Sequence, residues 1–458
     1  MIAARTVRTL VPLLVAALLA GCGHPSGVMT PIVLTAATPK TSQVSMLVAT
    51  TREPSGDPAT LFTGERSPKP YLTAVDVSIP PKRAPGTVQW PKRLPPNPAT
   101  DFAVTSVKEI DTVPQGRAWF RQNIQGGHAL VFVHGFNNKY EDSVFRLAQI
   151  VHDSGMQATP LLFTWPSRAQ LTAYEYDKES TNYSRTALEQ ALRTLAADAD
   201  VKDITILAHS MGTWLTMEAL RQMGIRDGHV NSKIHNVILA SPDIDIQVFA
   251  KQFAEMGTPT PKFTIFVSQD DKALAVSSFI TGRVSRLGAI DPTVEPYRSK
   301  LEAAGITAID LTKVKGEGLN HGKFAESPES VQLIGQRIIT GQTLTDSNVS
   351  LGQGLTAVVG GTVTTIGNVA ATAVAAPVTV LEQPIQGNRR PADETLQGDL
   401  KPQPLTRRQE AFLLVVTIWP SLVTVTYLPG DAFSGTVRSS KTRRPFSSAV
   451  LACSTRRA

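Results

Sequence analysis

The amino-acid sequence predicts an α/β fold: a mostly parallel central sheet with helices on both faces. Five short apolar runs, each typical of a strand buried on both faces, occupy residues 129–133, 160–165, 204–208, 237–240 and 263–267. Stretches with apolar residues at helical spacing lie between them. Because strands that alternate with helices form right-handed crossovers, these runs are expected to pair in parallel.

Composition excludes several other classes of protein. The chain has 458 residues, of which 42% are hydrophobic and 18% charged, so it is neither collagenous, coiled-coil nor wholly disordered. Its two cysteines, Cys22 and Cys453, supply neither a disulfide framework nor a cysteine metal cluster. Most of the net charge of +7 comes from residues 381–458, which hold 11 Lys and Arg against 6 Asp and Glu. The body is nearly neutral, so we expect no nucleic-acid partner.

The N-terminus reads as a targeting segment. Arg5 and Arg8 precede an apolar run at residues 10–20, which is short for a membrane span but typical of a signal peptide. The following Leu19-Ala20-Gly21-Cys22 resembles the lipobox of bacterial lipoproteins, in which the matching cysteine is lipid-modified. We therefore predict a signal peptide at 1–21, membrane anchoring through lipidated Cys22 at the bacterial cell envelope, and a tether at 22–44. An ordinary secretory peptide is the alternative.

The body of the chain, residues 45–340, is predicted to form one domain. Alternating apolar and polar residues predict half-buried strands at 45–51 and 71–79, and seven prolines make 80–98 an irregular connection. Helices are expected after Glu141, at 184–197 and at 214–223, and a final strand at 306–311.

Residues 341–458 are predicted to be a low-complexity C-terminal extension, rich in small and basic residues and partly disordered. Residues 347–381 carry no charge, so this segment is either a flexible apolar linker or a surface that packs on a helix or bilayer. Residues 411–428 are long enough for a membrane span, but Pro420 argues against a helix there.

The strand at 204–208 leads into His209-Ser210-Met211-Gly212 and then into a helix, which is the pattern of a nucleophile elbow. Such a tight turn exposes the serine hydroxyl and requires small residues two positions before and after it. Ala208 and Gly212 meet that requirement, although glycine is commoner at the first position. Ser210 is therefore the predicted nucleophile; a simple helix N-cap is the alternative.

A serine nucleophile needs a histidine base, which in this kind of sheet follows the last strand. His229 and His235 precede the next strand, whereas His321 follows the final one, so His321 is the predicted base. His209 is expected to be structural, because a side chain adjacent to the nucleophile points away from it.

The carboxylate that orients the base is expected at the carboxyl end of a strand. Residues 263–268 lead directly to Asp270 and Asp271, and we favour Asp271. Asp270, Asp243 and Asp245 stay open as alternatives.

The developing oxyanion needs two backbone N–H donors. The loop Val133-His134-Gly135-Phe136 offers the amide of Phe136, and the amide of Met211 lies beside the nucleophile. His134 is expected to brace this loop rather than to take part in catalysis.

The combined pattern resembles an uncharacterised family of bacterial alpha/beta hydrolases in the esterase/lipase superfamily. The resemblance covers about residues 45–340 and implies the alpha/beta-hydrolase fold, with the family's serine, acid and histidine falling on Ser210, Asp271 and His321. The motifs that carry it are Ala49-Thr50-Thr51-Arg52, Val77-Ser78-Ile79-Pro80, Val133-His134-Gly135-Phe136-Asn137, Phe163-Thr164-Trp165-Pro166-Ser167, Tyr176-Asp177, His209-Ser210-Met211-Gly212 and Asp271-Lys272-Ala273-Leu274.

The sequence thus predicts a serine hydrolase that cleaves an ester or related acyl bond through an acyl-enzyme, with no metal or organic cofactor. Its substrate is not specified by these motifs. An acyltransferase using the same triad and a binding or scaffolding lipoprotein without turnover are the alternatives.

Overall fold

A computed structural model describes residues 25–35, 38, 40–335, 355–359, 362–365, 412–419 and 422–429. They belong to two compact units, residues 1–375 and 376–458. Of the second unit the structure describes two antiparallel strands, β12 (Phe412–Trp419) and β13 (Leu422–Pro429). The candidate span at 411–428 therefore has strands in its described part. No described helix is both long and apolar enough to cross a membrane.

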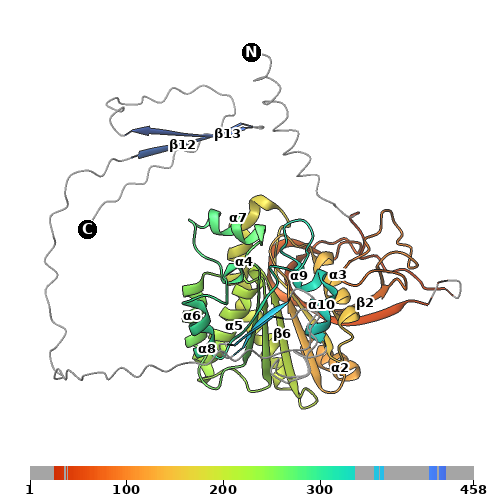
Figure 1. The fold of residues 1–458 in the computed structure, drawn as a ribbon. Coiled ribbons are helices and arrows are strands. Elements are labelled where there is room, and N and C mark those ends of the chain that lie inside the picture. Colours follow the sequence, from red (N-terminus) through yellow and green to blue (C-terminus); the bar gives the residue numbers. More distant parts are fainter. Residues whose placement is uncertain are drawn as a thin grey trace. The chain divides into compact units, whose positions relative to one another are not determined.

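One sheet organises the first unit, with the strand order β11-β10-β9-β8-β7-β6-β4-β5-β1-β2-β3 (Figure 1). All pairs from β9 through β8, β7, β6, β4 and β5 to β1 are parallel, and the outer pairs are antiparallel. The strands are β1 (Ser42–Pro54), β2 (Phe62–Ile79), β3 (Ala103–Ile110), β4 (His128–Val133), β5 (Thr159–Thr164), β6 (Asp203–His209), β7 (Ile234–Ala240), β8 (Lys262–Val267), β9 (Thr307–Asp310), β10 (Thr356–Val359) and β11 (Thr362–Thr365). This arrangement is the predicted alpha/beta-hydrolase type of sheet.

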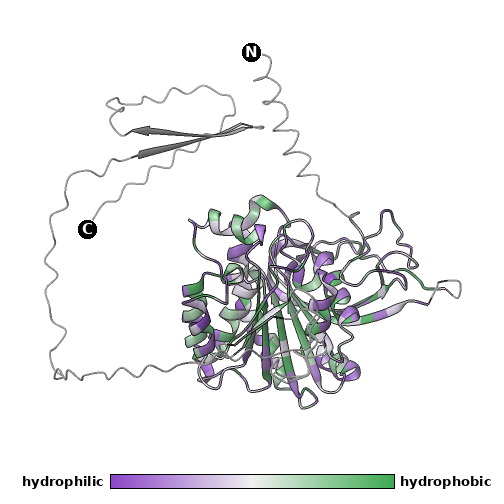
Figure 2. Ribbon diagram, in the orientation of Figure 1, coloured by the Kyte–Doolittle hydropathy of each residue, from purple (hydrophilic) through white to green (hydrophobic). Residues whose placement is uncertain are grey.

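Helices cover both faces of the sheet (Figures 1 and 2). On each face, apolar side chains of the sheet and of the helices pack together into a core. The first core joins the sheet to α2, α4, α5, α6 and α8, and the second joins it to α3, α9 and α10. The helices are α2 (Val113–Asn123), α3 (Tyr140–Ser154), α4 (Tyr174–Ala196), α5 (Met211–Asp227), α6 (Ile246–Ala254), α7 (Lys272–Ile280), α8 (Tyr297–Ala303), α9 (Lys323–Glu326) and α10 (Pro328–Leu333); η1 (Leu171–Ala173) and η2 (Leu287–Ala289) are single 3-10 turns.

Both predicted ends of the domain need correction. Val28 and Met29, inside the expected tether, are fully buried in the second core, and the Met29 N–H donates to the carbonyl oxygen of Ala59. Beyond residue 340, β10 pairs with β9 and buries Ala357 and Val358. Apolar side chains on both sides of the expected boundaries thus extend the folded unit, because they find room on the sheet.

Candidate active site

Ser210 lies between β6 and α5 in a strained turn. Its φ of 52° and ψ of −124° fall in a region that side-chain-bearing residues rarely adopt. Two hydrogen bonds to the Ser210 backbone hold the turn: the Ser210 N–H donates to Ala240 O at 2.9 Å, and Ser210 O accepts from the Thr213 hydroxyl at 2.6 Å. The strained backbone expected of an elbow is therefore present, whereas Ser210, whose hydroxyl is expected to be exposed, is only 4% exposed.

Two glycines allow neighbouring segments to approach this turn. A Cβ at Gly212 would lie 2.2 Å from His134 O, and one at Gly135 would lie 2.8 Å from the Cβ of Ser210. Neither contact is possible for a larger residue without movement of the backbone. The loop after β4 and the elbow are thus in direct contact, as an oxyanion site requires.

Asp271 and His321, 50 residues apart in sequence, meet beside this turn. Asp271 Oδ2 lies 2.7 Å from His321 Nδ1. The carboxylate is buried as the N-cap of α7, where its Oδ1 accepts the Leu274 N–H at 3.0 Å. A bond from Nδ1–H to a carboxylate leaves Nε2 as the proton acceptor, which is the tautomer that a general base needs.

The loop that carries His321 is fastened to the strands next to the elbow. The backbone carbonyl oxygen of His321 accepts from Ser241 Oγ at 3.2 Å and lies 3.3 Å from His209 Nε2. Among the described residues, no hydrogen bond joins Ser210 Oγ to His321. Such bonds often form only when a substrate is in place.

The other three candidate acids have different partners. Asp270 accepts from Lys323 Nζ at 2.6 Å and from Asn320 Nδ2 at 2.9 Å. Burial raises the pKa of Asp270, but the hydrogen bonds from Lys323 and Ser268 outweigh this effect and hold that pKa below its usual value. Asp245 caps α6 through the amides of Gln247 and Val248. None of these contacts involves His321.

Asp243 belongs to a buried polar cluster beside the elbow. Its carboxylate lies 3.2 Å from Arg286 Nε and accepts from Ser277 Oγ at 2.5 Å and Tyr174 OH at 3.1 Å. Burial and the nearby Asp243 charge raise the pKa of Tyr174. Only Asp271 among the four acids therefore contacts the candidate base.

His209 packs beside the candidate base. Its ring lies 4.7 Å from that of His321 and 4.7 Å from that of Phe324, measured between centroids. Burial, and then the neighbouring His321, hold the pKa of His209 well below its ordinary value. A neutral ring wedged between two others supports the loop of the candidate base rather than carrying protons.

The amides of Phe136 and Met211 are available as oxyanion donors. Within the described part of the chain, neither N–H donates to another protein group. The Phe136 N–H shares a peptide group with the Gly135 carbonyl, whose oxygen lies 2.8 Å from His134 Nδ1 and accepts from Asn138 Nδ2 at 3.3 Å. Both N–H groups are therefore free to donate to an oxyanion.

His134 links the loop after β4 to the start of the loop after β5. Its Nε2 accepts the Trp165 N–H at 3.1 Å, its Nδ1 lies 2.8 Å from Gly135 O, and its ring stacks on that of Trp165 at 4.9 Å. Burial, followed by the charge of Arg52, lowers the pKa of His134 to about 3. The ring is neutral and acts as a fixed spacer between β4 and β5.

Arg52, which the sequence reading did not single out for a role, holds the same loop from the other side. It is 1% exposed, and its guanidinium donates to Asn138 O at 2.8 Å, Ser167 O at 3.0 Å and Thr164 Oγ1 at 2.9 Å. Burial lowers its pKa to about 10, so it stays charged at neutral pH. Asp177 fastens the adjoining loop through Ser167 Oγ at 2.5 Å. Arg52 and Asp177 belong to the motifs Ala49-Thr50-Thr51-Arg52 and Tyr176-Asp177. These motifs were the only sequence features that could have indicated a role for the two residues.

The described residues contain no group of three or more His, Cys, Asp or Glu side chains that could hold a metal ion. Cys22 lies outside the described residues.

Comparison with known families agrees with the predicted resemblance. Residues 115–337 match the model of a family described as alpha/beta hydrolase of unknown function (DUF900). The matched range contains Ser210, Asp271 and His321 and the backbone amides of Phe136 and Met211. Comparison with curated proteins gives no match.

Proposed function

From the premise that residues 115–337 form an alpha/beta hydrolase of that family, we propose that the protein is a serine hydrolase of esters or related acyl compounds. The observation that carries this proposal is the 2.7 Å pair between Asp271 and His321 beside the strained Ser210. An N-cap serine has no need of a buried carboxylate–histidine pair next to it. A scaffold without turnover has no need of one either.

The proposed reaction proceeds in two steps. Ser210 Oγ attacks the acyl carbon while His321 Nε2 takes its proton, and the amides of Phe136 and Met211 stabilise the oxyanion. Collapse breaks the bond to the leaving alcohol, which receives the proton from His321. Water then attacks the acyl-enzyme, and His321 Nε2 again takes the proton. Collapse of this second intermediate breaks the bond to Ser210 Oγ, which recovers its proton from His321 as the carboxylic acid leaves. Asp271 keeps the imidazole in the required tautomer throughout.

A fluorophosphonate probe tests the nucleophile directly, because it reacts with activated serines. We expect the full-length protein to be labelled, and Ser210→Ala and heat-denatured protein to remain unlabelled. The same preparations are then assayed on p-nitrophenyl esters of increasing chain length, where Ser210→Ala should lower kcat by about 10⁴-fold or more. A folded wild-type protein that is neither labelled nor active would overturn the proposal.

We also propose that Cys22 carries a lipid that anchors the protein at the cell envelope. The support is the Leu19-Ala20-Gly21-Cys22 pattern after an apolar run. Acyl chains on one residue give firm binding, since each buried CH₂ contributes about 0.8 kcal/mol. Cys22→Ala should move the protein out of the membrane fraction, whereas Cys453→Ala should not; unchanged pelleting of the Cys22 variant would contradict the anchor.

A further inference from the structure

The outward face of helix α7 is apolar and exposed. Val276, Phe279 and Ile280 are 55%, 70% and 49% exposed, and their spacing of three and four residues places them on one side of the helix. Leu274 and Ser277 form the buried side. A surface helix normally turns its polar residues toward solvent and its apolar residues inward. The reverse arrangement in α7 indicates that its outward face contacts an apolar partner.

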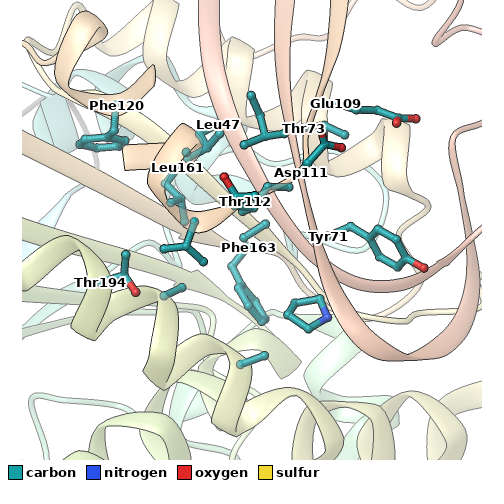
Figure 3. A pocket seen from close by; sticks show the side chains of 18 of the residues that line it. Leu47, Tyr71, Thr73, Glu109, Asp111, Thr112, Phe120, Leu161, Phe163 and Thr194 are labelled. Carbon is teal, nitrogen blue, oxygen red and sulfur yellow. The ribbon is translucent and has the colours of Figure 1, made fainter. Parts of the chain in front are cut away.

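A groove of about 560 Å³ between the β1-β2-β3 side of the sheet and helices α2 and α4 offers no comparable surface (Figure 3). Leu47, Leu161 and Phe163 line it but are at most 4% exposed, so their apolar atoms are already covered. Single exposed apolar residues are common on protein surfaces. In α7, by contrast, three large ones lie within five consecutive positions, 276–280, and form a patch.

A fourth exposed apolar side chain lies beside the start of α7. Leu319 is 54% exposed, and its carbonyl oxygen accepts the Lys272 N–H at 3.0 Å. Leu319 belongs to the loop that carries His321, and Lys272 follows Asp271 directly. The apolar surface is therefore next to the candidate active site.

The exposed charges on and next to α7 are positive. Lys272 and Arg283 are exposed at and just beyond its two ends, and residues 272–290 contain no Asp or Glu. Asp270, which precedes the helix, accepts from Lys323 Nζ at 2.6 Å. Apolar side chains flanked by cations match the chemistry of a bilayer with anionic headgroups, which takes up the first and attracts the second.

The position of α7 in the fold also suits a bilayer. The helix follows β8 and so lies at the carboxyl end of the parallel strands (Figure 1). The N-terminal residues reach the same end, because the Met29 N–H donates to the carbonyl oxygen of Ala59, in the connection that follows the carboxyl end of β1. One flat surface can thus contact both α7 and the residues next to the proposed lipid on Cys22.

We propose that α7 docks on a lipid bilayer that contains anionic lipids, with Val276, Phe279 and Ile280 among the upper acyl carbons and Lys272 and Arg283 at the phosphates. With nine residues the helix lies along the interface and does not cross it. This contact goes beyond the proposed hydrolysis and can be tested without turnover.

A fluorescent NBD group on a single cysteine tests where the protein touches a membrane. The background is the full chain with Cys22→Ala and Cys453→Ala, which removes the proposed anchor and leaves no other thiol. Ala275→Cys places the probe on α7, and Ala303→Cys places it on α8, which leads into the amino end of β9; both alanines are exposed. With vesicles of phosphatidylcholine and phosphatidylglycerol in equal amounts, emission at position 275 should shift to the blue and increase several-fold. Emission at position 303 should not change.

Paired substitutions separate the apolar from the ionic contribution to the signal at position 275. Phe279→Gln with Ile280→Gln should reduce the signal about tenfold or more at a lipid concentration below saturation. Lys272→Gln with Arg283→Gln should reduce it by about fivefold per charge. Lys300→Gln, at an exposed position of α8, is the control and should have no effect. Because the substituted side chains are exposed, thermal unfolding should stay as in the wild type.

Three results would overturn the proposal. The first is an emission at position 275 that vesicles do not alter, and the second is an equal change at positions 275 and 303. The third is a blue-shifted emission at position 275 before vesicles are added, which would show that another part of the chain or a second copy covers α7. Dependence of that emission on protein concentration would identify the second copy.

Discussion

At the scale of single residues, the candidate site depends on one strained backbone and one long-range pair. The conformation of Ser210 costs of the order of 1–3 kcal/mol, and bonds to Ala240 and Thr213 offset it. Asp271 serves both as the cap of α7 and as the partner of His321. Its charge and its capping role can be separated by substitution, because asparagine caps a helix as well as aspartate does.

Asp271→Asn should therefore keep the fold but lose activity. The amide would favour the wrong histidine tautomer, and kcat on a p-nitrophenyl ester should fall by about 10³- to 10⁴-fold. Asp245→Asn is the matched control, since Asp245 caps α6 without contacting His321. Kinetics and thermal unfolding of both variants measure the two roles; equal activity in the two variants would reassign the acid.

At the scale of elements, the site is assembled where the ends of β1, β4, β5 and β6 meet. Arg52 at the end of β1 reaches the loops after β4 and β5 at once, through Asn138 and Ser167. His134 fills the space between them. The oxyanion loop is thus positioned by a buried guanidinium whose five donors suit several carbonyl oxygens.

Arg52→Lys should disturb this positioning, because a single ammonium cannot reach the same set of acceptors. We expect kcat to fall by about tenfold or more with a smaller change in KM, and the free energy of unfolding to fall by about 2–4 kcal/mol. Arg168→Lys, at an exposed ion pair with Glu65, should change stability by less than about 1 kcal/mol. Ester kinetics with urea unfolding check both variants, and wild-type kinetics in Arg52→Lys would contradict the positioning role.

Local patterns predicted the central elements well. The apolar runs at 129–133, 204–208 and 263–267 became β4, β6 and β8, because parallel strands buried on both faces have a distinctive composition. β10 and β11, rich in small residues and threonine, had no such signature and depend on pairing with β9. The roles of Arg52 and Asp177 were missed for a related reason: their partners are remote in sequence, and charged residues are ordinarily exposed.

At the scale of the whole molecule, buried neutral histidines make stability depend on pH. The pKa of His134 is lowered to about 3, and that of His209 is also lowered, in both cases first by burial. A histidine that is neutral when folded but takes up a proton when unfolded favours the unfolded state below its unfolded pKa near 6.5. The contribution of these neutral histidines to the free energy of unfolding is therefore complete above pH 6.5. For His134 it is lost as the pH falls toward 3.

The free energy of unfolding should accordingly decline below pH 6.5, with His134 contributing about 1.4 kcal/mol per pH unit. Urea titrations between pH 7.5 and 4 measure the slope. His134→Gln should reduce it, even though the variant is less stable at pH 7.5. His235→Gln, at an exposed position, should leave it as in the wild type, and a slope unaffected by His134→Gln would show that other groups cause the decline.

The buried N-terminal residues have a consequence for where substrates can be met. Val28 and Met29 are fixed in the core, and Pro25 is already part of the described structure. Only Gly23 and His24 lie between Pro25 and Cys22. The three steps of chain from Pro25 to Cys22 span at most about 11 Å. A lipid on Cys22 would thus leave the domain with a very short linker, and the folded residues would stay close to the lipid headgroups. An enzyme anchored in this way would meet substrates that lie in or on its own membrane, and it would not reach substrates farther from the membrane surface.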